Sequence, residues 1–406
     1  MVYVQDIDGK PMMPTTRHGK VRRLLKANKA TVVNLCPFTI QLTYKSTDHK
    51  QPVTLGIDAG AKHIGFSATT EKEELFACET ILRTDIVDLL STRSQNRRTR
   101  RSRLRYRKPK FNNRVFSKKK GWVAPSVKQR IDSHLNEVNE IHKILPITKI
   151  VIEAAQFDTH KMKNPNISGI DYQNGEQLGF WNVREYVLFR DGHKCSYCKG
   201  KSKDLILNIH HIESRKTGGD SPSNLITLCE TCHKEYHKGN IGLKVRRGKS
   251  LCGAAIMGIM KWRLYDELKS RYSNVSMTFG YITKYNRIKY GIEKSHTSDA
   301  FVISKNFNAK RIEYQYLKRL VRRHNRQIHK MKILKGGKKK NNQAPFEVFG
   351  FRLFDKVLYN NEINFIYGRR KSGNFNIRDF NGENPKDVSY KKLKLIRGKR
   401  HPIILK

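Results

Sequence analysis

The sequence predicts an α/β protein of several domains, and three observations lead to this expectation. Its 406 residues allow two to four domains, and a 37% share of hydrophobic residues is enough for separate cores. Short apolar strands, in residues 52–70 and 147–158, alternate with helical patterns. Paired cysteines and histidines between residues 195 and 237 mark a further small unit.

The chain is strongly basic. It has 82 lysine and arginine residues against 35 aspartate and glutamate residues, which gives a formal net charge of +47. A charge this large predicts a polyanionic partner, and nucleic acid is the first candidate. An anionic membrane surface is the competing partner, but no stretch reaches the roughly 18 apolar residues of a membrane span, and the basic runs lack a facing apolar stripe. We therefore expect no membrane association.

Cysteine usage indicates a reducing compartment. Four of the seven cysteines fall into two Cys-x2-Cys pairs, which leaves Cys36, Cys78 and Cys252 as an odd remainder. Structural disulfides are therefore not expected, and this fits the cytosol. The first residues have neither a basic n-region nor an apolar h-region, so we expect no signal peptide. We expect a cytoplasmic location instead.

Residues 1–52 read as a small mixed unit. Residues 2–5 and 31–35 are strand-like, and residues 17–28 are a candidate for a basic helix. The string PMMPT at residues 11–15 carries no chemistry by itself and would ordinarily be a turn.

Residues 53–90 are expected to begin a sheet. The segment PVTLGIDAGAKHIGFSATT reads as an apolar strand that ends on Asp58, then a glycine turn and a second strand. Actin-like ATPases use a similar strand and turn for phosphate and Mg²⁺, so this motif alone does not decide the chemistry.

Residues 91–122 are expected to form an arginine-rich helix. From Arg93 to Lys120 the chain has nine arginines, five lysines and no acidic residue. A charge run is usually solvated or disordered. This run is internal and arginine-dominated, which favours a helix surrounded by phosphate, because guanidinium groups bind phosphate in a bidentate manner. The candidate nucleic-acid-binding residues are Arg93, Arg97, Arg98, Arg100, Arg101, Arg103, Arg105 and Arg107.

Residues 123–182 continue the sheet. Apolar residues repeat at intervals of three and four from Val127 to Leu145, which predicts an amphipathic helix that packs on the sheet. The apolar segment ITKIVIEAAQFD follows and predicts a strand that ends on Glu153.

Residues 183–243 contain the densest chemistry of the chain. Two Cys-x2-Cys pairs are separated by 30 residues, a spacing that can place four thiolates around one structural Zn²⁺. The candidate zinc ligands are Cys195, Cys198, Cys229 and Cys232. Paired cysteines alone are also compatible with a zinc ribbon that only binds.

The histidines of this block predict a second site. His210 and His211 lie between the cysteine pairs, and His233 and His237 share one helix face because they are four residues apart. Cys232 points about 100° away from His233 on an ideal helix. The zinc and the histidine chemistry can therefore be separate.

Taken with SPSNLITLC and CHKEYH, this order of motifs resembles the HNH (ββα-metal) endonuclease family, in the subgroup with a zinc knuckle. The resemblance implies that His210 binds one catalytic Mg²⁺ and that His211 is the general base. Asn224 would fix the loop that holds the base. His233 would be the last letter of HNH, and His237 a further possible ligand. Hydrolysis of a phosphodiester needs a base, because water is a poor nucleophile at neutral pH, and a cation, because negative charge gathers on the phosphate.

Residues 244–306 supply a third acidic element, because KSHTSDAFVIS begins a probable helix with His296 and Asp299 on one face. With Asp58 and Glu153 this order resembles a RuvC domain, an RNase H-like nuclease. The resemblance implies that the three carboxylates bind two Mg²⁺ ions and that His296 lies near the nucleophile.

The complete order of segments resembles the IscB family of transposon-encoded, RNA-guided nucleases, over roughly residues 1–306. PMMPT matches the family's PLMP motif except at Met12, and residues 91–122 would be the bridge helix. The resemblance implies an ωRNA whose guide pairs with one strand of a double-stranded DNA target beside a short flanking motif. HNH would cut the guide-paired strand and RuvC the displaced strand. A monomeric protein in a prokaryotic, nucleoid-associated ribonucleoprotein is implied.

Residues 307–406 match the family less closely. Residues 310–340 are basic and are expected to be helical, with a linker from Lys335. Residues 347–380 read as short strands with Asn-Asn and Ser-Gly turns, which predicts a small β-rich domain. By resemblance this end would contact ωRNA and the flanking DNA motif, although a generic basic β domain is equally compatible.

Two other functions remain open. A guide-independent HNH endonuclease of the homing or restriction type would need its own sequence-reading surface, and neither a helix-turn-helix nor a zinc-finger array is evident. A non-catalytic RNA-binding protein would not need Asp58, Glu153, His211 and Asp299 together. We therefore expect a Mg²⁺-dependent, RNA-guided endodeoxyribonuclease.

Overall fold

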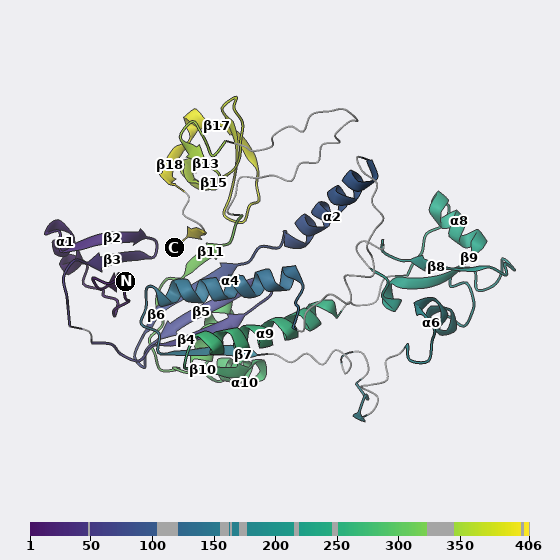
Figure 1. Ribbon diagram of the computed structural model, residues 1–406, viewed down its shortest axis with the longest axis horizontal. Helices are drawn as coiled ribbons and strands as arrows, with labels where there is room; N and C mark the ends of the chain where they lie inside the picture. Colours follow the sequence, from purple (N-terminus) through teal and green to yellow (C-terminus); the bar gives the residue numbers. More distant parts are fainter. Residues whose placement is uncertain are drawn as a thin grey trace. The chain divides into compact units, whose positions relative to one another are not determined.

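The computed structural model describes residues 1–47, 49–103, 121–154, 162, 165–169, 177–214, 219–245, 251–322, 345–398 and 402–405. The chain divides into two compact units (Figure 1). The first combines Met1–Ala155 with Ile259–Lys406, and the second is Gln156–Gly258. The larger unit is therefore built from two segments on either side of an insertion.

A three-stranded sheet with one helix forms the N-terminal part of the larger unit. Its strands run in the order β1 (Tyr3–Gln5), β3 (Phe38–Leu42), β2 (Ala30–Leu35), and α1 (His18–Lys26) lies between β1 and β2 in sequence. Val21 of α1 is buried with apolar residues of the strands, so the helix covers this sheet with its apolar face. The two strands and the helix that the sequence predicts here are present.

A seven-stranded mixed sheet is the centre of the larger unit. The strand order is β10-β7-β4-β5-β6-β11-β19. Strands β10, β7 and β4 are parallel, whereas β4, β5 and β6 are antiparallel neighbours. The bounds are β4 (Thr54–Ala59), β5 (His63–Thr69), β6 (Glu74–Ile81), β7 (Lys149–Ala154), β10 (Val275–Phe279), β11 (Tyr316–Arg319) and β19 (Ile403–Leu405).

Helix α11 (His296–Ser304) lies directly against the backbone of β4 and β5. A Cβ atom at Gly56 would lie 2.0 Å from the carbonyl oxygen of Ala300, and one at Gly65 would lie 1.8 Å from that of His296. Any side chain at these two positions would push the helix away. Gly56 and Asp58 point to the same face of β4, because side chains alternate along a strand. The two glycines therefore let α11 approach Asp58.

Helix α4 (Pro125–His142) covers the other face of the sheet. Its Glu137 accepts a hydrogen bond from Thr80 of β6, and Thr80 pairs with Ile64, whose side chain points away from Gly65 and α11. The buried apolar residues of α4 are those of the predicted amphipathic pattern, namely Val127, Ile131, Leu135, Val138 and Ile141. This prediction is confirmed.

The C-terminal segment of the chain differs from the sequence prediction. Residues 316–319, expected to be helical, form strand β11, which pairs in parallel with β6. The pairing buries Tyr316 in the sheet, and this tertiary contact overrides the helical pattern read from the sequence. Strand β19 then adds an antiparallel edge to β11. The central sheet therefore extends beyond residue 306.

The arginine-rich segment is helical as far as it is described. Helix α2 spans Ile86–Arg103, and the side chains of Arg93 and Arg97 are exposed. Arg98, Arg100, Arg101 and Arg103 belong to α2, but their side chains lie outside the described set, and Arg105 and Arg107 lie outside the described residues.

A small β domain follows near the C-terminus, as predicted. Its five-stranded antiparallel sheet has the order β17-β16-β15-β14-β18, beside a short hairpin of β12 and β13. The bounds are β12 (Glu347–Val348), β13 (Phe351–Arg352), β14 (Lys356–Tyr359), β15 (Glu362–Arg369), β16 (Asn374–Arg378), β17 (Lys386–Ser389) and β18 (Lys394–Arg397). Residues such as Val357, Ile366, Phe375 and Ile377 form its core.

The smaller unit contains a ββα element. Strands β8 (Leu207–His211) and β9 (Leu225–Cys229) are antiparallel, and α8 (Glu230–Lys238) follows β9 directly. Helix α6 (Val183–Arg190) precedes them, capped by the Asn182 side chain. Two further described helices lie beyond this element: α9 (Cys252–Arg271) begins in the smaller unit and continues into the larger one, and α10 (Gly280–Lys289) belongs to the larger unit. Among the described helices, none has both the length and the apolar character needed to cross a membrane.

Candidate active sites

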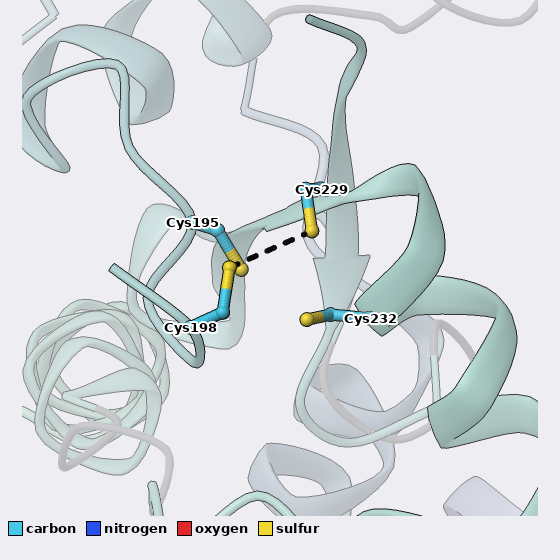
Figure 2. A group of neighbouring side chains, drawn as sticks. All are labelled: Cys195, Cys198, Cys229 and Cys232. Atoms are coloured by element: carbon cyan, nitrogen blue, oxygen red, sulfur yellow. Dashed lines mark hydrogen bonds between the residues drawn. The ribbon is translucent and has the colours of Figure 1, made fainter. Parts of the chain in front are cut away.

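The four cysteines of the smaller unit converge as the sequence predicts. Figure 2 shows Cys195, Cys198, Cys229 and Cys232 with their sulfur atoms directed into one space. All four sulfurs lie within 4.8 Å of one another, and those of Cys198 and Cys229 are 3.8 Å apart. A tetrahedron with Zn–S bonds of about 2.3 Å has edges of about 3.8 Å. The cluster therefore fits a structural Zn²⁺.

Three histidines form a second, separate cluster. His210 comes from β8, and His233 and His237 come from one face of α8. Their nitrogen atoms lie within 4.8 Å of one another. His210 is 6% exposed, and its Nε2 atom is buried without a hydrogen-bond partner. Burial, followed by the charges of His233 and His237, lowers the pKa of His210 to about 4, so its ring is neutral at pH 7. A buried neutral imidazole with an unused nitrogen suits a metal ligand.

The chemistry of these three ligands narrows the type of cation. Imidazole nitrogens suit Zn²⁺, Ni²⁺, Cu²⁺ and iron, whereas Mg²⁺ prefers oxygen ligands and near-octahedral geometry. Three imidazoles without a carboxylate in the group therefore fit a transition-type divalent cation better than the Mg²⁺ that the sequence analysis assigns to this site.

His211 lies beside a carboxylate that sequence reasoning missed. Its Nε2 atom is 2.9 Å from Oδ1 of Asp220, and the His211 side chain is partly exposed. A carboxylate accepts hydrogen bonds, so in the neutral ring Nε2 carries the proton and Nδ1 keeps a lone pair. Asp220 comes after the histidine pair, directly behind two glycines. No sequence pattern indicates that it pairs with His211.

Asn224 links the two ends of the loop after the histidine pair. Its side-chain oxygen accepts a hydrogen bond from the Glu213 amide at 2.9 Å, and its side-chain nitrogen donates to the carbonyls of Glu213 and Gly219 at 3.0 and 2.9 Å. The residue is fully buried. These bonds are what the predicted loop-fixing role requires.

Two of the predicted carboxylates of the larger unit lie at the carboxyl ends of neighbouring strands of the central sheet, and the third lies in a helix packed on these strands. Ile57 pairs with Ile152 in the parallel ladder of β4 and β7, and Asp58 and Glu153 are the next residues on these neighbouring strands, whose backbones run about 5 Å apart. Asp299 lies in the first turn of α11, the helix packed on these strands. The burial of Asp299 and the nearby charge of Asp58 raise its pKa. The structure therefore brings the three carboxylates together.

Each carboxylate has a basic partner. Asp58 bonds through Oδ2 to Nδ1 of His296 at 2.7 Å. Glu153 accepts a hydrogen bond from Lys261 Nζ at 2.9 Å, and Asp299 lies 3.1 Å from Nε of Arg287. Lys261 comes from α9 and Arg287 from α10, and the sequence analysis identified neither.

Carboxylate oxygens are the ligands that Mg²⁺ prefers, so this donor set fits the predicted cation. The bond to Asp58 raises the pKa of His296 despite partial burial. Among the described residues, the three carboxylates are not gathered into a group with all ligand atoms within 4.8 Å.

A third cluster joins His63, Glu79 and His296, and sequence reasoning missed its first two members. His63 Nδ1 is 2.7 Å from Glu79 Oε1, and the rings of His63 and His296 stack at 5.1 Å with an interplanar angle of 7°. Imidazole lone pairs lie in the ring plane, so two parallel rings cannot direct them at one ion. We therefore interpret this cluster as holding the His296 ring in place, with His63 stacked on it and Glu79 bonded to His63, rather than as a metal site.

Two family models match the chain. Residues 2–175 match the model described as RRXRR protein, and residues 195–239 match the HNH endonuclease model. Among curated proteins, anaredoxin from Nostoc sp. (strain PCC 7120) is 29% identical over 66 residues, which is 16% of this chain and 84% of that protein.

Two solved structures show a weaker similarity. Cas9 of Streptococcus thermophilus in complex with an AGGA PAM has a TM-score of 0.33 and 15% identity, covering 45% of this chain and 26% of that chain. The type II-C Cas9 of Actinomyces naeslundii has a TM-score of 0.25 and 12% identity, covering 63% of this chain and 60% of that chain. The match thus spans about a quarter of the first Cas9. The chain is an α/β protein that carries an HNH endonuclease domain.

Proposed function

We propose that the chain is an RNA-guided DNA endonuclease with two cutting centres. The observation that carries the proposal is that one strongly basic chain holds both the HNH cluster and a sheet edge with three carboxylates, in separate units. The sheet segments 53–90, 123–182 and 244–306 would form a RuvC-like centre, and residues 183–243 the HNH centre.

At the HNH centre, His211 would accept a proton from the attacking water. Asp220 holds Nε2, so the lone pair on Nδ1 is the available base. His210, His233 and His237 would hold the cation, and Asn224 keeps the intervening loop in place. A divalent cation at either centre would stabilise charge that gathers on the phosphate during hydrolysis.

At the RuvC-like centre, His296 would play the corresponding part. Its Nδ1 is held by Asp58, which leaves the lone pair on Nε2 to accept a proton from water. Asp58, Glu153 and Asp299 would hold Mg²⁺. Lys261 pairs with Glu153 and Arg287 with Asp299, so the two cations offset part of the repulsion among the carboxylates.

The remaining segments would hold nucleic acid. The exposed arginines of α2 suit a bridge helix beside a guide–target duplex, since guanidinium groups bind phosphate. Residues 307–406 would contact the ωRNA and the flanking motif. The protein would act as a monomer in a ribonucleoprotein.

Strand-resolved plasmid cleavage tests the function. The protein is co-expressed with its flanking noncoding locus, the guide is matched or scrambled, and reactions contain Mg²⁺, Mn²⁺, Ni²⁺ or EDTA. We expect cleavage that follows the guide and stops in EDTA. Cleavage of the displaced strand should need Mg²⁺ or Mn²⁺, which oxygen ligands bind well. Cleavage of the guide-paired strand should also occur with Ni²⁺. Cleavage independent of the guide would instead identify a homing-type or restriction-type HNH endonuclease.

Replacing Asp58 with alanine is expected to stop cleavage of the displaced strand and leave a nickase for the guide-paired strand. The change removes a cation ligand and the group that orients His296. Labelled strands resolved on a denaturing gel measure this. If Asp58→Ala still linearises plasmid, the assignment of Asp58 is wrong.

Replacing His63 with alanine is expected to slow displaced-strand cleavage about 10- to 100-fold, because the His296 ring loses the ring it stacks on. His63→Phe keeps a flat ring and should restore most of the rate, whereas a need for charge at position 63 would leave it slow. Cleavage of the guide-paired strand in the same reaction is the internal control. Equal rates for wild type and His63→Ala would rule out the supporting role.

A further inference from the structure

Helix α10 and the end of β10 expose a row of large apolar side chains. Tyr281, Tyr285 and Ile288 are 73%, 65% and 64% exposed, and Phe279 is 38% exposed. The three helical residues share one face, because they are separated by four and three positions. The rings of Phe279 and Tyr281 stack with centroids 6.1 Å apart and an interplanar angle of 9°. Single exposed apolar residues are ordinary, but a contiguous row marks an interaction surface.

The charge of this surface indicates its partner. The α10 sequence GYITKYNRIK has no acidic residue, and the exposed Lys284 and Lys289 lie beside the apolar row. Aromatic rings alternating with lysines suit single-stranded nucleic acid, because bases stack on rings while ammonium groups attract phosphates. A protein partner that buries an apolar face would not need these cations.

The row begins at the carboxyl end of β10, next to Glu153 at the carboxyl end of β7. Thr278 pairs with Glu153 and Phe279 with Ala154 in the ladder of β10 and β7. A Cβ atom at Gly280 would lie 3.4 Å from Glu153 Oε1. The inner side of α10 carries Arg287, which contacts Asp299. One helix therefore holds a catalytic carboxylate on one side and displays the apolar row on the other.

We infer that Phe279, Tyr281, Tyr285 and Ile288 form a stacking ledge for the bases of the DNA strand that enters the carboxylate site. Lys284 and Lys289 contact its phosphates. The inference rests on the proposed function, since it names the strand cut at that site. The carboxylates repel a phosphate backbone, so binding through base faces holds the strand next to them without relying on charge alone. Bases already stacked in a duplex cannot use the ledge, which therefore selects single strands.

Binding of a fluorescein-labelled oligothymidylate to the full chain tests the ledge, in EDTA and at about 0.3 M salt, where contacts to phosphates are weakened. Loss of one stacking ring is expected to weaken binding about 5- to 150-fold, so Tyr281→Ala and Tyr285→Ala should each show such a loss. The Tyr281→Phe/Tyr285→Phe double variant keeps both rings and should bind like the wild type.

A second readout locates the contact. An oligonucleotide with 5-iodouracil should cross-link to Tyr281 or Tyr285 under near-ultraviolet light, and unlabelled duplex of the same sequence should compete poorly. Unchanged affinity of both alanine variants, cross-links elsewhere only, or equal competition by duplex would overturn the ledge. Altered melting of the alanine variants with unchanged binding would do the same, since the rings would then pack against protein.

The ledge and the proposed function fail separately. Guide-dependent cleavage by the wild type with no effect of the alanine variants on oligonucleotide binding removes only the ledge. Ring-dependent binding by a wild type that never cuts in a guide-dependent manner removes the proposed function and supports the ledge as a single-strand site.

Discussion

Replacing Cys195 with serine is expected to unfold the HNH domain and to leave the seven-stranded sheet intact. The domain has a small core in which Cys195, Cys229 and Cys232 themselves take part beside Ile226 and Leu228. A core this small needs additional stabilisation. Structural zinc supplies an apparent folding free energy of about 10 to 16 kcal/mol in small zinc domains, so the loss of one ligand exceeds what the core can offset.

Zinc content and hydrogen exchange measure this outcome. Purified wild type should contain the zinc of the cysteine cluster in addition to any cation at the three-histidine site. Cys195→Ser should lack the zinc of the cysteine cluster, with fast exchange confined to the region around residues 195–239. Cys36→Ser is the matched control, because Cys36 lies outside the cluster and should retain both metal and protection. A zinc-free Cys195→Ser variant with native protection in that region would show that the cysteines do not depend on a metal.

Replacing His211 with alanine is expected to slow cleavage of the guide-paired strand by about 10² to 10⁴ and to leave a nickase for the displaced strand. The structure explains why no neighbour can take over. His210, His233 and His237 are directed toward one another, and His210 is buried, whereas His211 is hydrogen-bonded to Asp220. The remaining histidines would be occupied as ligands when a cation is bound.

Single-turnover cleavage with each strand labelled separately measures the His211 effect. Asp220→Asn is the graded comparison, since an amide holds the ring less firmly and does not favour the same tautomer, and its rate should fall between those of His211→Ala and wild type. Displaced-strand cleavage in the same reaction reports on correct folding and guide loading. Linear product from His211→Ala at the wild-type rate would show that another group is the base.

Local patterns account for what the sequence analysis predicted well. The spacing of the cysteine pairs and the repeat of two histidines on one helical turn specify which atoms can meet, because neighbouring residues in a helix or strand have fixed geometry. Asp58 and Glu153 were found because each ends an apolar strand, and the parallel pairing of β4 and β7 places them side by side.

Long-range pairing explains what the sequence analysis missed. The helix expected in residues 310–340 is a strand at residues 316–319, because pairing with β6, more than two hundred residues earlier, buries Tyr316. Lys261 reaches Glu153 across 108 positions, and no local rule links such residues. Asp220 was missed for a different reason, since it belongs to an irregular loop without periodicity.

The sequence by itself determined the ligand types, their order along the chain and the basic character that predicts a nucleic-acid partner. The tertiary structure decided which groups neutralise the carboxylates, that His63 and Glu79 support His296, and that α10 displays its aromatic row beside Glu153. The physical reason is that side-chain chemistry is a property of each residue. Its electrostatic and packing environment is set by segments that meet only when the sheet assembles, as when Asp58 meets His296 across 238 positions.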